Sequence, residues 1–179
     1  MKCLLFAGAP NTGKSQSNYH LAKYLINDKG YNFKNPEEGF IEIDEQGKKT
    51  LNGKPIENIH NDKNPSKDVA GLLVNDSNTS KSILFHSYVD SDDCLNQLKK
   101  RIQKNKDAYL LITSIRNESD KMHEKTNELL KEMGIIDKIE IPLGKVVKGK
   151  NRDADVNWYL NSIHTLSKNL IDMLLFPSH

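Results

Sequence analysis

Cysteine is scarce in this sequence. Only two cysteines, Cys3 and Cys94, occur in 179 residues. They cannot build the disulfide framework of a small secreted domain, and neither lies near a histidine at a metal-ligand spacing. Zinc sites and Cys–His nucleophilic catalysis are therefore disfavoured, and a reducing, cytoplasmic setting is expected.

Long apolar runs and a strong charge imbalance are missing as well. No run approaches the roughly 18 apolar residues that a membrane helix needs. The apolar residues 2–7 lead into a polar segment at Pro10, which makes them too short for an export signal. The 26 basic residues are balanced by 24 acidic ones, and a net charge of +2 produces no overall field toward nucleic acid or anionic lipid. We expect neither a membrane nor a nucleic acid as a partner.

What is present suits one folded domain over residues 1–179. Hydrophobic residues make up 36% of the chain and charged residues 28%, enough apolar surface for a core. Apolar strands and amphipathic helices alternate, which predicts an α/β fold with a mostly parallel sheet covered on both faces. The predicted strands are 2–7, 83–86, 108–113 and 135–143, and the predicted helices are 14–27, 92–102, 119–133 and 156–174.

A small hairpin-rich insert is predicted at about residues 31–68. Asn52-Gly53 is a strong hairpin signal, and residues 39–60 show two candidate antiparallel turns. Residues 71–74 fit a short strand or a helical turn equally well.

Two further side chains are expected to have structural roles. Trp158, near the end of the chain, is expected in the core. His86 is expected to be partly buried with its hydrogen bonds satisfied.

The candidate nucleotide-binding loop precedes the first predicted helix. Its residues are Gly8, Ala9, Pro10, Asn11, Thr12, Gly13, Lys14, Ser15 and Gln16. The first eight match the phosphate-binding pattern G-x-x-x-x-G-K-[ST] at every fixed position. Glycines let the backbone curl so that its N–H groups point at phosphate oxygens, and the helix adds its positive end. Lys14 would contact the β- and γ-phosphates, and Ser15 would be a ligand of Mg²⁺.

Over residues 2–28 the chain resembles the P-loop NTPase superfamily. The loop is similar to those of nucleotide kinases and related ATPases, and Pro10-Asn11 before Gly13-Lys14-Ser15 also resembles the loop of small GTPases. The resemblance implies a three-layer P-loop NTPase fold that binds ATP or another nucleoside triphosphate with Mg²⁺.

Two segments argue against the GTPase branch. The guanine-reading element of that family ends in Asp, whereas residues 105–108 read Asn-Lys-Asp-Ala. Asp68-Val69-Ala70-Gly71 matches the family's D-x-x-G but follows a polar loop, where the family has a hydrophobic strand. ATP is therefore preferred over GTP.

The resemblance also implies a second carboxylate, which holds Mg²⁺ through water at the end of a strand. Asp90, a few residues past the strand 83–86, is the candidate for this metal-binding and catalytic role. Asp92 and Asp93 are alternatives. Acidic residues in the first turn of a helix also favour its dipole, so a structural role for these residues stays open.

Arginine is rare in this chain, which makes each arginine informative. Arg116 follows the strand 108–113 at its carboxyl end, where open α/β sheets bind ligands. Arg152 lies in the basic segment 145–152. The resemblance to nucleotide kinases implies that such arginines clamp the transferring phosphoryl group, so Arg116 is a catalytic candidate and Arg152 a nucleotide-binding one. Arg101 is expected on a solvated helix face.

These observations predict a small kinase-like phosphotransferase that acts on a small molecule. The insert at 31–68 occupies the place where monophosphate kinases hold their acceptor, but it fits a surface for a protein partner equally well. The alternative is a regulatory ATPase or a nucleotide-dependent partner-binding module. A GTPase-like switch is less favoured.

Overall fold

The computed structural model describes residues 1–35, 38–43, 49–52, 68–77, 81–145 and 152–176. These residues form strands and helices in alternation over most of the chain. In chain order the elements are β1 (Lys2–Ala7), α1 (Lys14–Lys29), β2 (Asn32–Phe33), β3 (Gly39–Ile43), β4 (Lys49–Asn52), β5 (Val69–Val74), β6 (Ile83–His86), α2 (Asp92–Lys104), β7 (Leu110–Ile115), α3 (Lys121–Glu132), β8 (Lys138–Pro142) and α4 (Arg152–Leu175).

The strands form one mixed sheet in the order β4-β3-β5-β6-β7-β1-β8, with β2 paired to β5. Strands β6, β7, β1 and β8 run parallel, and Leu4 of β1 lies between Ile112 and Ile139 of its neighbours. Strands β5, β3 and β4 continue the sheet in antiparallel pairs. The predicted α/β class and the parallel strands are confirmed. The direction of β5 was not predicted, and this strand resolves the open assignment of residues 71–74.

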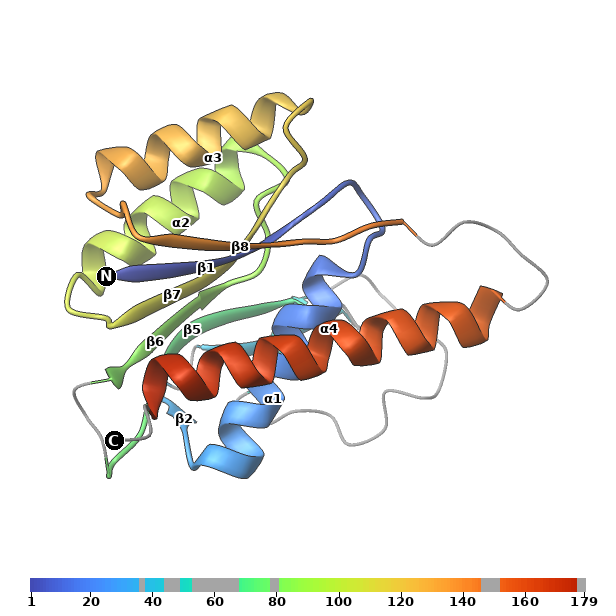
Figure 1. Cartoon of the computed structure of the whole chain (residues 1–179). Coiled ribbons are helices and arrows are strands. Elements are labelled where there is room, and N and C mark those ends of the chain that lie inside the picture. Colours follow the sequence, from blue (N-terminus) through green and yellow to red (C-terminus); the bar gives the residue numbers. More distant parts are fainter. Residues whose placement is uncertain (36–37, 44–48, 53–67, 78–80, 146–151, 177–179) are drawn as a thin grey trace.

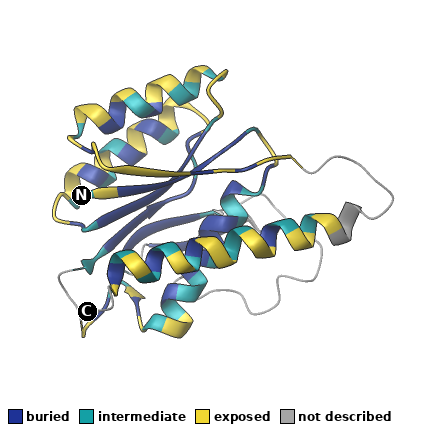
Figure 2. Cartoon of the chain, viewed as in Figure 1, coloured by how far each residue is buried: buried dark blue, intermediate teal, exposed yellow. Residues whose placement is uncertain are grey.

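Helices cover both faces of the sheet (Figure 1). Helices α2 and α3 lie on one face, and α1 and α4 lie on the other. Alternate residues of β1 divide between two cores, because side chains along a strand point to opposite faces. Leu4 and Phe6 pack with residues of α1 and α4, whereas Cys3 and Leu5 pack with residues of α2 and α3. Figure 2 shows the buried central strands of the sheet and helices whose buried residues alternate with exposed ones.

The helix boundaries follow local rules. Helix α1 ends at Lys29 and is followed by Gly30, whose φ of 71° is a left-handed conformation that favours glycine. Helix α2 begins after Ser91, whose hydroxyl accepts a hydrogen bond from the Cys94 N–H. Helix α3 begins at Lys121 and is capped by Asp120. The Asp120 carboxylate accepts from the Met122 N–H at 2.8 Å.

The predicted insert joins the main sheet. Strands β3 and β4 form an antiparallel pair, which confirms the first of the two predicted hairpins, and β3 pairs in turn with β5. The second hairpin, after Asn52, lies outside the described residues. Glu38 is fixed beside β5, where its carboxylate accepts from the Leu72 N–H at 3.0 Å. Gly71 makes this close approach possible, since a Cβ there would lie 2.5 Å from the Glu38 Cβ.

Helix α4 corrects one sequence-based expectation. Leu160, Ile171 and Leu175 face the core, but Trp158 is 71% exposed on the opposite side of the helix. The prediction of a core tryptophan was therefore wrong, because the apolar residues of this helix do not all share one face.

Within the described part of the chain, no helix combines the length and apolar character required to cross a membrane.

Candidate functional site

The loop between β1 and α1 is held by the two strands beside β1. Gly8 N donates to Ile115 O of β7 at 3.1 Å, and Leu143 N, just past β8, donates to Ala7 O at 2.6 Å. A Cβ at Gly8 would lie 2.6 Å from Thr12 Oγ1 and 2.8 Å from Leu143 O. Glycine is therefore the residue that fits at this position, and the loop is anchored at its start.

The end of this loop leaves a helix N-terminus open. Gly13 adopts a φ of 92° and contributes no side-chain cap, and the first turn of α1 contains no acidic residue. Ser17 N donates to Gly13 O at 2.8 Å, which is the first bond of the helix. The N–H groups of Lys14, Ser15 and Gln16 precede that bond and so have no acceptor within the helix. Such an end attracts anions. Helices α2 and α3, in contrast, are both capped by side chains.

The Lys14 side chain folds back over the loop. Its Nζ donates to Gly8 O at 2.8 Å and to Ala9 O at 2.7 Å. Burial lowers the pKa of Lys14 below its ordinary value, and the Arg116 guanidinium lowers it further, while Asp90 and Asp120 oppose the shift. These two carbonyl oxygens satisfy two of the three donors of the ammonium and leave its charge uncompensated. The site therefore favours an anion beside Lys14.

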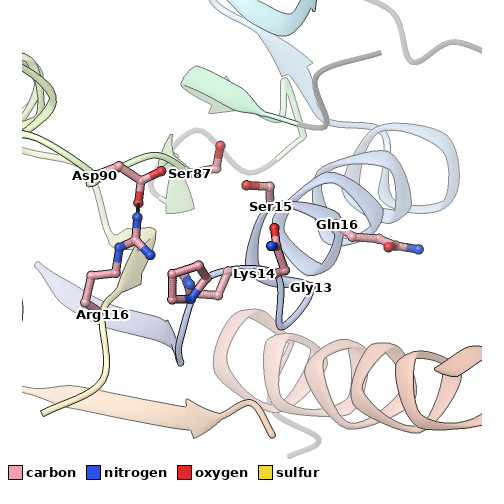
Figure 3. A pocket seen from close by; sticks show the side chains of 9 residues that line it. Gly13, Lys14, Ser15, Gln16, Ser87, Asp90 and Arg116 are labelled. Carbon is pink, nitrogen blue, oxygen red and sulfur yellow. Dashed lines mark ion pairs between the residues drawn. The ribbon is translucent and has the colours of Figure 1, made fainter. Parts of the chain in front are cut away.

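A cavity of about 430 Å³ opens in front of the loop (Figure 3). Its volume lies within the roughly 300–1,000 Å³ typical of small-molecule sites. The carboxyl ends of three parallel strands supply its walls: the loop after β1, Ser87 and Asp90 after β6, and Arg116 after β7. Strands β1 and β7 are neighbours, yet the helices that follow them cover opposite faces. Open α/β sheets bind ligands at the carboxyl ends of strands where the following helices switch from one face of the sheet to the other.

Asp90 and Arg116 form an ion pair at the edge of this cavity. Arg116 NH2 lies 2.6 Å from Asp90 Oδ1. The Asp90 side chain is 58% exposed and the Arg116 side chain 15%. Arg116 Nε is buried and has no hydrogen-bond partner among the described residues. The pair thus places a guanidinium in the same cavity lining as Lys14.

The structure brings most of the predicted site residues together. The cavity is lined by Pro10, Asn11, Gly13, Lys14, Ser15, Gln16, Asp90 and Arg116, with Ser87 in addition. The side chain of Gln16 points away from the ion pair (Figure 3). Arg152 is the first residue of α4, and its side chain lies outside the described part of the chain.

The alternative metal ligands fit less well. Asp92 is paired with Lys125 at 2.6 Å, on the side of α2 that faces α3, and neither Asp92 nor Asp93 lines the cavity. The described residues contain no group of three or more His, Cys, Asp or Glu side chains suited to hold a metal by themselves. Ser15 and Asp90, the two predicted metal ligands, both line the cavity.

Two residues of the site were not predicted. The Ser87 hydroxyl accepts from Val69 N at 2.8 Å and donates to Asp68 Oδ1 at 3.0 Å, so it connects the cavity to β5. Its position directly after the strand 83–86 was the available signal. Asn18 is fully buried, and its Nδ2 donates to Lys14 O and to Ser114 Oγ, which fixes α1 against β7.

Arg101 differs from its sequence-based expectation. Its side chain is only 24% exposed, and NH1 lies 3.9 Å from Glu38 Oε1. The residue is therefore not part of a solvated helix face, because the segment before β3 covers this side of α2.

Comparisons with protein-family models, with curated proteins and with solved structures gave no match. The function proposed below therefore depends on the geometry of this site.

Proposed function

We propose that this chain has a P-loop NTPase fold, binds ATP or a related nucleoside triphosphate with Mg²⁺, and transfers the terminal phosphoryl group to a small molecule. One observation carries the proposal: an uncapped helix N-terminus, the Lys14 ammonium and the Arg116 guanidinium all meet in one cavity. Phosphoryl transfer depends on positioning and on neutralising charge, and this set of groups supplies both.

Each residue has a defined task in this proposal. The N–H groups of Gly13, Lys14 and Ser15 bind phosphate oxygens, and Lys14 exchanges its two loop carbonyls for the β- and γ-phosphates. Ser15 binds the metal directly, and Asp90 holds it through water. A bound Mg²⁺ would neutralise phosphate charge. Arg116, which lines the cavity, faces the charge that develops on the transferred group.

A second candidate function is a nucleotide-dependent binding module or regulatory ATPase. Among the described residues that line the cavity, Asp90 is the only acid, and it is paired with Arg116. If Asp90 serves only the metal, no other carboxylate among these residues is available to activate a water, which favours a protein that binds nucleotide and releases it slowly. Steady ADP formation that no added metabolite stimulates would favour this candidate over the transferase.

Thermal unfolding with ATP, with GTP and without nucleotide, each with and without Mg²⁺, tests the proposal. We expect ATP with Mg²⁺ to raise the midpoint most, because a ligand that binds the folded state stabilises it. Lys14→Ala should remove this increase and remain folded, while Lys23→Ala, on the same helix outside the cavity, should retain it. Equal shifts with ATP and GTP would contradict the adenine preference, and no shift with either would contradict nucleotide binding.

A further inference from the structure

A second cavity adjoins the phosphate site. It has a volume of about 460 Å³ and lies between β3, the segment after β6 and α2. Asp90 lines both cavities, so the second one begins where the first ends. Arg101 and Gln97 line its other side and also the next hollow along α2. The second cavity therefore runs from the phosphate site at Asp90 toward Arg101.

Charge is distributed unevenly along this second cavity. Asp68 and Asp90 are both carboxylates in its lining, and Asp68 is held in place by the hydrogen bond from Ser87. Ser87 itself lines the phosphate site, so these two carboxylates mark the near end. Arg101 is the only cation among the described residues that line the cavity. The near end is anionic and the far end is cationic.

The Arg101 guanidinium lies among polar neighbours. It is near enough to Tyr88 to oppose the rise that burial causes in the pKa of that hydroxyl, which donates to Gln97 Oε1 at 3.2 Å. Glu38 balances part of its charge from 3.9 Å, too far for a hydrogen bond. A guanidinium has five N–H donors, so donors remain for a ligand. Arg101 thus matches a carboxylate or phosphate group, which a guanidinium binds through paired hydrogen bonds.

We infer that this second cavity binds the phosphoryl acceptor, and that the acceptor is a hydroxylated small molecule with one anionic group. The anionic group lies on Arg101, and the reacting hydroxyl lies at Asp90. A phosphate as the reacting group is disfavoured, because Asp68 and Asp90 would repel it, whereas carboxylates accept hydrogen bonds from hydroxyls. The inference rests on the proposed function, since it requires a triphosphate in the first cavity.

The phosphoryl transfer needs only the triphosphate, the acceptor hydroxyl and the Asp90 carboxylate. The acceptor oxygen forms a bond to the γ-phosphorus, the bond between that phosphorus and the β,γ-bridging oxygen breaks, and ADP leaves. The proton of the acceptor hydroxyl passes to the Asp90 carboxylate. Oδ1 of that group pairs with Arg116 in the structure, and a bound triphosphate would draw Arg116 toward phosphate. An ionised carboxylate has about four acceptor sites, so Asp90 can face the metal and also accept this proton.

Formation of ADP from ATP and Mg²⁺, followed together with ³¹P NMR of the products, tests the inference. The added acceptors are ribose 5-phosphate and gluconate as anionic polyols, ribose as the neutral control, and AMP and UMP as nucleoside monophosphates. We expect an anionic polyol to stimulate ADP formation at least about tenfold more than ribose, because one charge-assisted contact contributes about 1.5–3 kcal/mol. The product should give a new phosphate monoester signal.

Other outcomes overturn the inference in distinguishable ways. A new phosphoanhydride signal from AMP or UMP would show that a phosphate is the reacting group and would contradict the orientation. If no acceptor stimulates ADP formation while ATP still raises the thermal midpoint, the acceptor site is wrong and nucleotide binding survives. If ATP does not bind, the proposed function fails with it.

Variants of Arg101 separate its role from stability. Arg101→Ala should raise the KM for the anionic acceptor about tenfold or more and leave the KM for ATP unchanged. Arg101→Lys keeps a positive charge beside buried Glu38, so it should fold even if the alanine variant does not, and it should also raise the acceptor KM because the paired donors are lost. Lys131→Ala, exposed on α3, is the matched control. An unchanged acceptor KM in Arg101→Lys and Arg101→Ala would overturn the assignment.

Discussion

The Arg116 guanidinium lies 2.6 Å from the Asp90 carboxylate and joins the ends of β6 and β7 across the cavity that contains Lys14. Two cations and one anion thus face the open end of α1. An incoming triphosphate with Mg²⁺ adds both an anion and a cation to this set. Arg116 can then turn to phosphate while Asp90 turns to the metal, so the ion pair keeps both side chains in place for the ligand.

Asp90→Asn should remove much of the effect of Mg²⁺ on ATP affinity. The amide keeps the size of the side chain but loses the charge that attracts the metal. We expect a change of less than about 1 kcal/mol in the free energy of unfolding, since Asp90 is largely exposed and solvent screens the pair. Calorimetric titration of ATP with and without Mg²⁺ measures the effect. Asp93→Asn is the control, and an equal response to Mg²⁺ in both variants would contradict the role of Asp90.

Gly13→Ala and Gly134→Ala should differ in stability. Both positions have positive φ, 92° and 72°, and a left-handed conformation costs a non-glycine residue about 1–2 kcal/mol. A Cβ at Gly13 would also lie 2.7 Å from Leu160 Cδ2, whereas a Cβ at Gly134 meets nothing within 4 Å. Urea unfolding should show the larger loss for Gly13→Ala, and only this variant should weaken ATP binding. A larger loss for Gly134→Ala would contradict the packing of the loop against α4.

One thiol should react in the folded protein. Cys3 is buried, and burial raises the pKa of its thiol to about 12, against a smaller opposing effect of Lys138. Cys94 is partly exposed in the lining of the second cavity. Ellman's reagent should therefore label Cys94 rapidly and Cys3 only after unfolding in urea. Cys94→Ser should leave no fast-reacting thiol. Equal rates for both thiols in the native wild type would contradict the buried position of β1.

Stability should fall as the pH decreases below about 6.5. Burial lowers the pKa of His86 to about 3, and the Arg101 charge contributes to the shift. The unfolded chain binds a proton at this histidine near pH 6.5, but the folded protein does not do so until about pH 3. The unfolded state is therefore favoured between these values, by up to about 1.4 kcal/mol per pH unit.

His86→Phe keeps a ring in this buried position and cannot titrate. Urea unfolding between pH 6.5 and pH 4.5 should show a shallower loss of stability for this variant than for the wild type, whatever its stability at neutral pH. Parallel slopes for His86→Phe and the wild type would show that His86 is not buried in its neutral form.

The most accurately predicted elements are those that local sequence determines. Strand β1, the loop and α1 follow from residues 2–30, where glycine conformations and apolar spacing decide the backbone. Asp90 and Arg116 were predicted separately, each from its place after a strand. Predicting their ion pair would have required knowing that β6 and β7 are adjacent in the sheet. Local sequence patterns do not indicate which strands are neighbours.

The second cavity could not be predicted either, because its lining also depends on which strands are neighbours. Arg101 has the sequence context of a solvated helix face, among Lys99, Lys100 and Lys104. Its environment is determined by Glu38 and Tyr88, which long-range strand pairing brings to α2. Such pairing depends on the combined packing of distant segments, so local spacing does not indicate which charges meet.

Titration of ¹⁵N-labelled protein with ATP and Mg²⁺, followed by NMR of the backbone amides, tests the central claim most directly. The account predicts that the largest chemical-shift changes belong to Gly13, Lys14, Ser15 and Gln16, whose N–H groups form the open end of α1, and that Lys14→Ala removes them. Unchanged shifts at these four amides in the presence of excess ATP and Mg²⁺ would contradict phosphate binding by this loop.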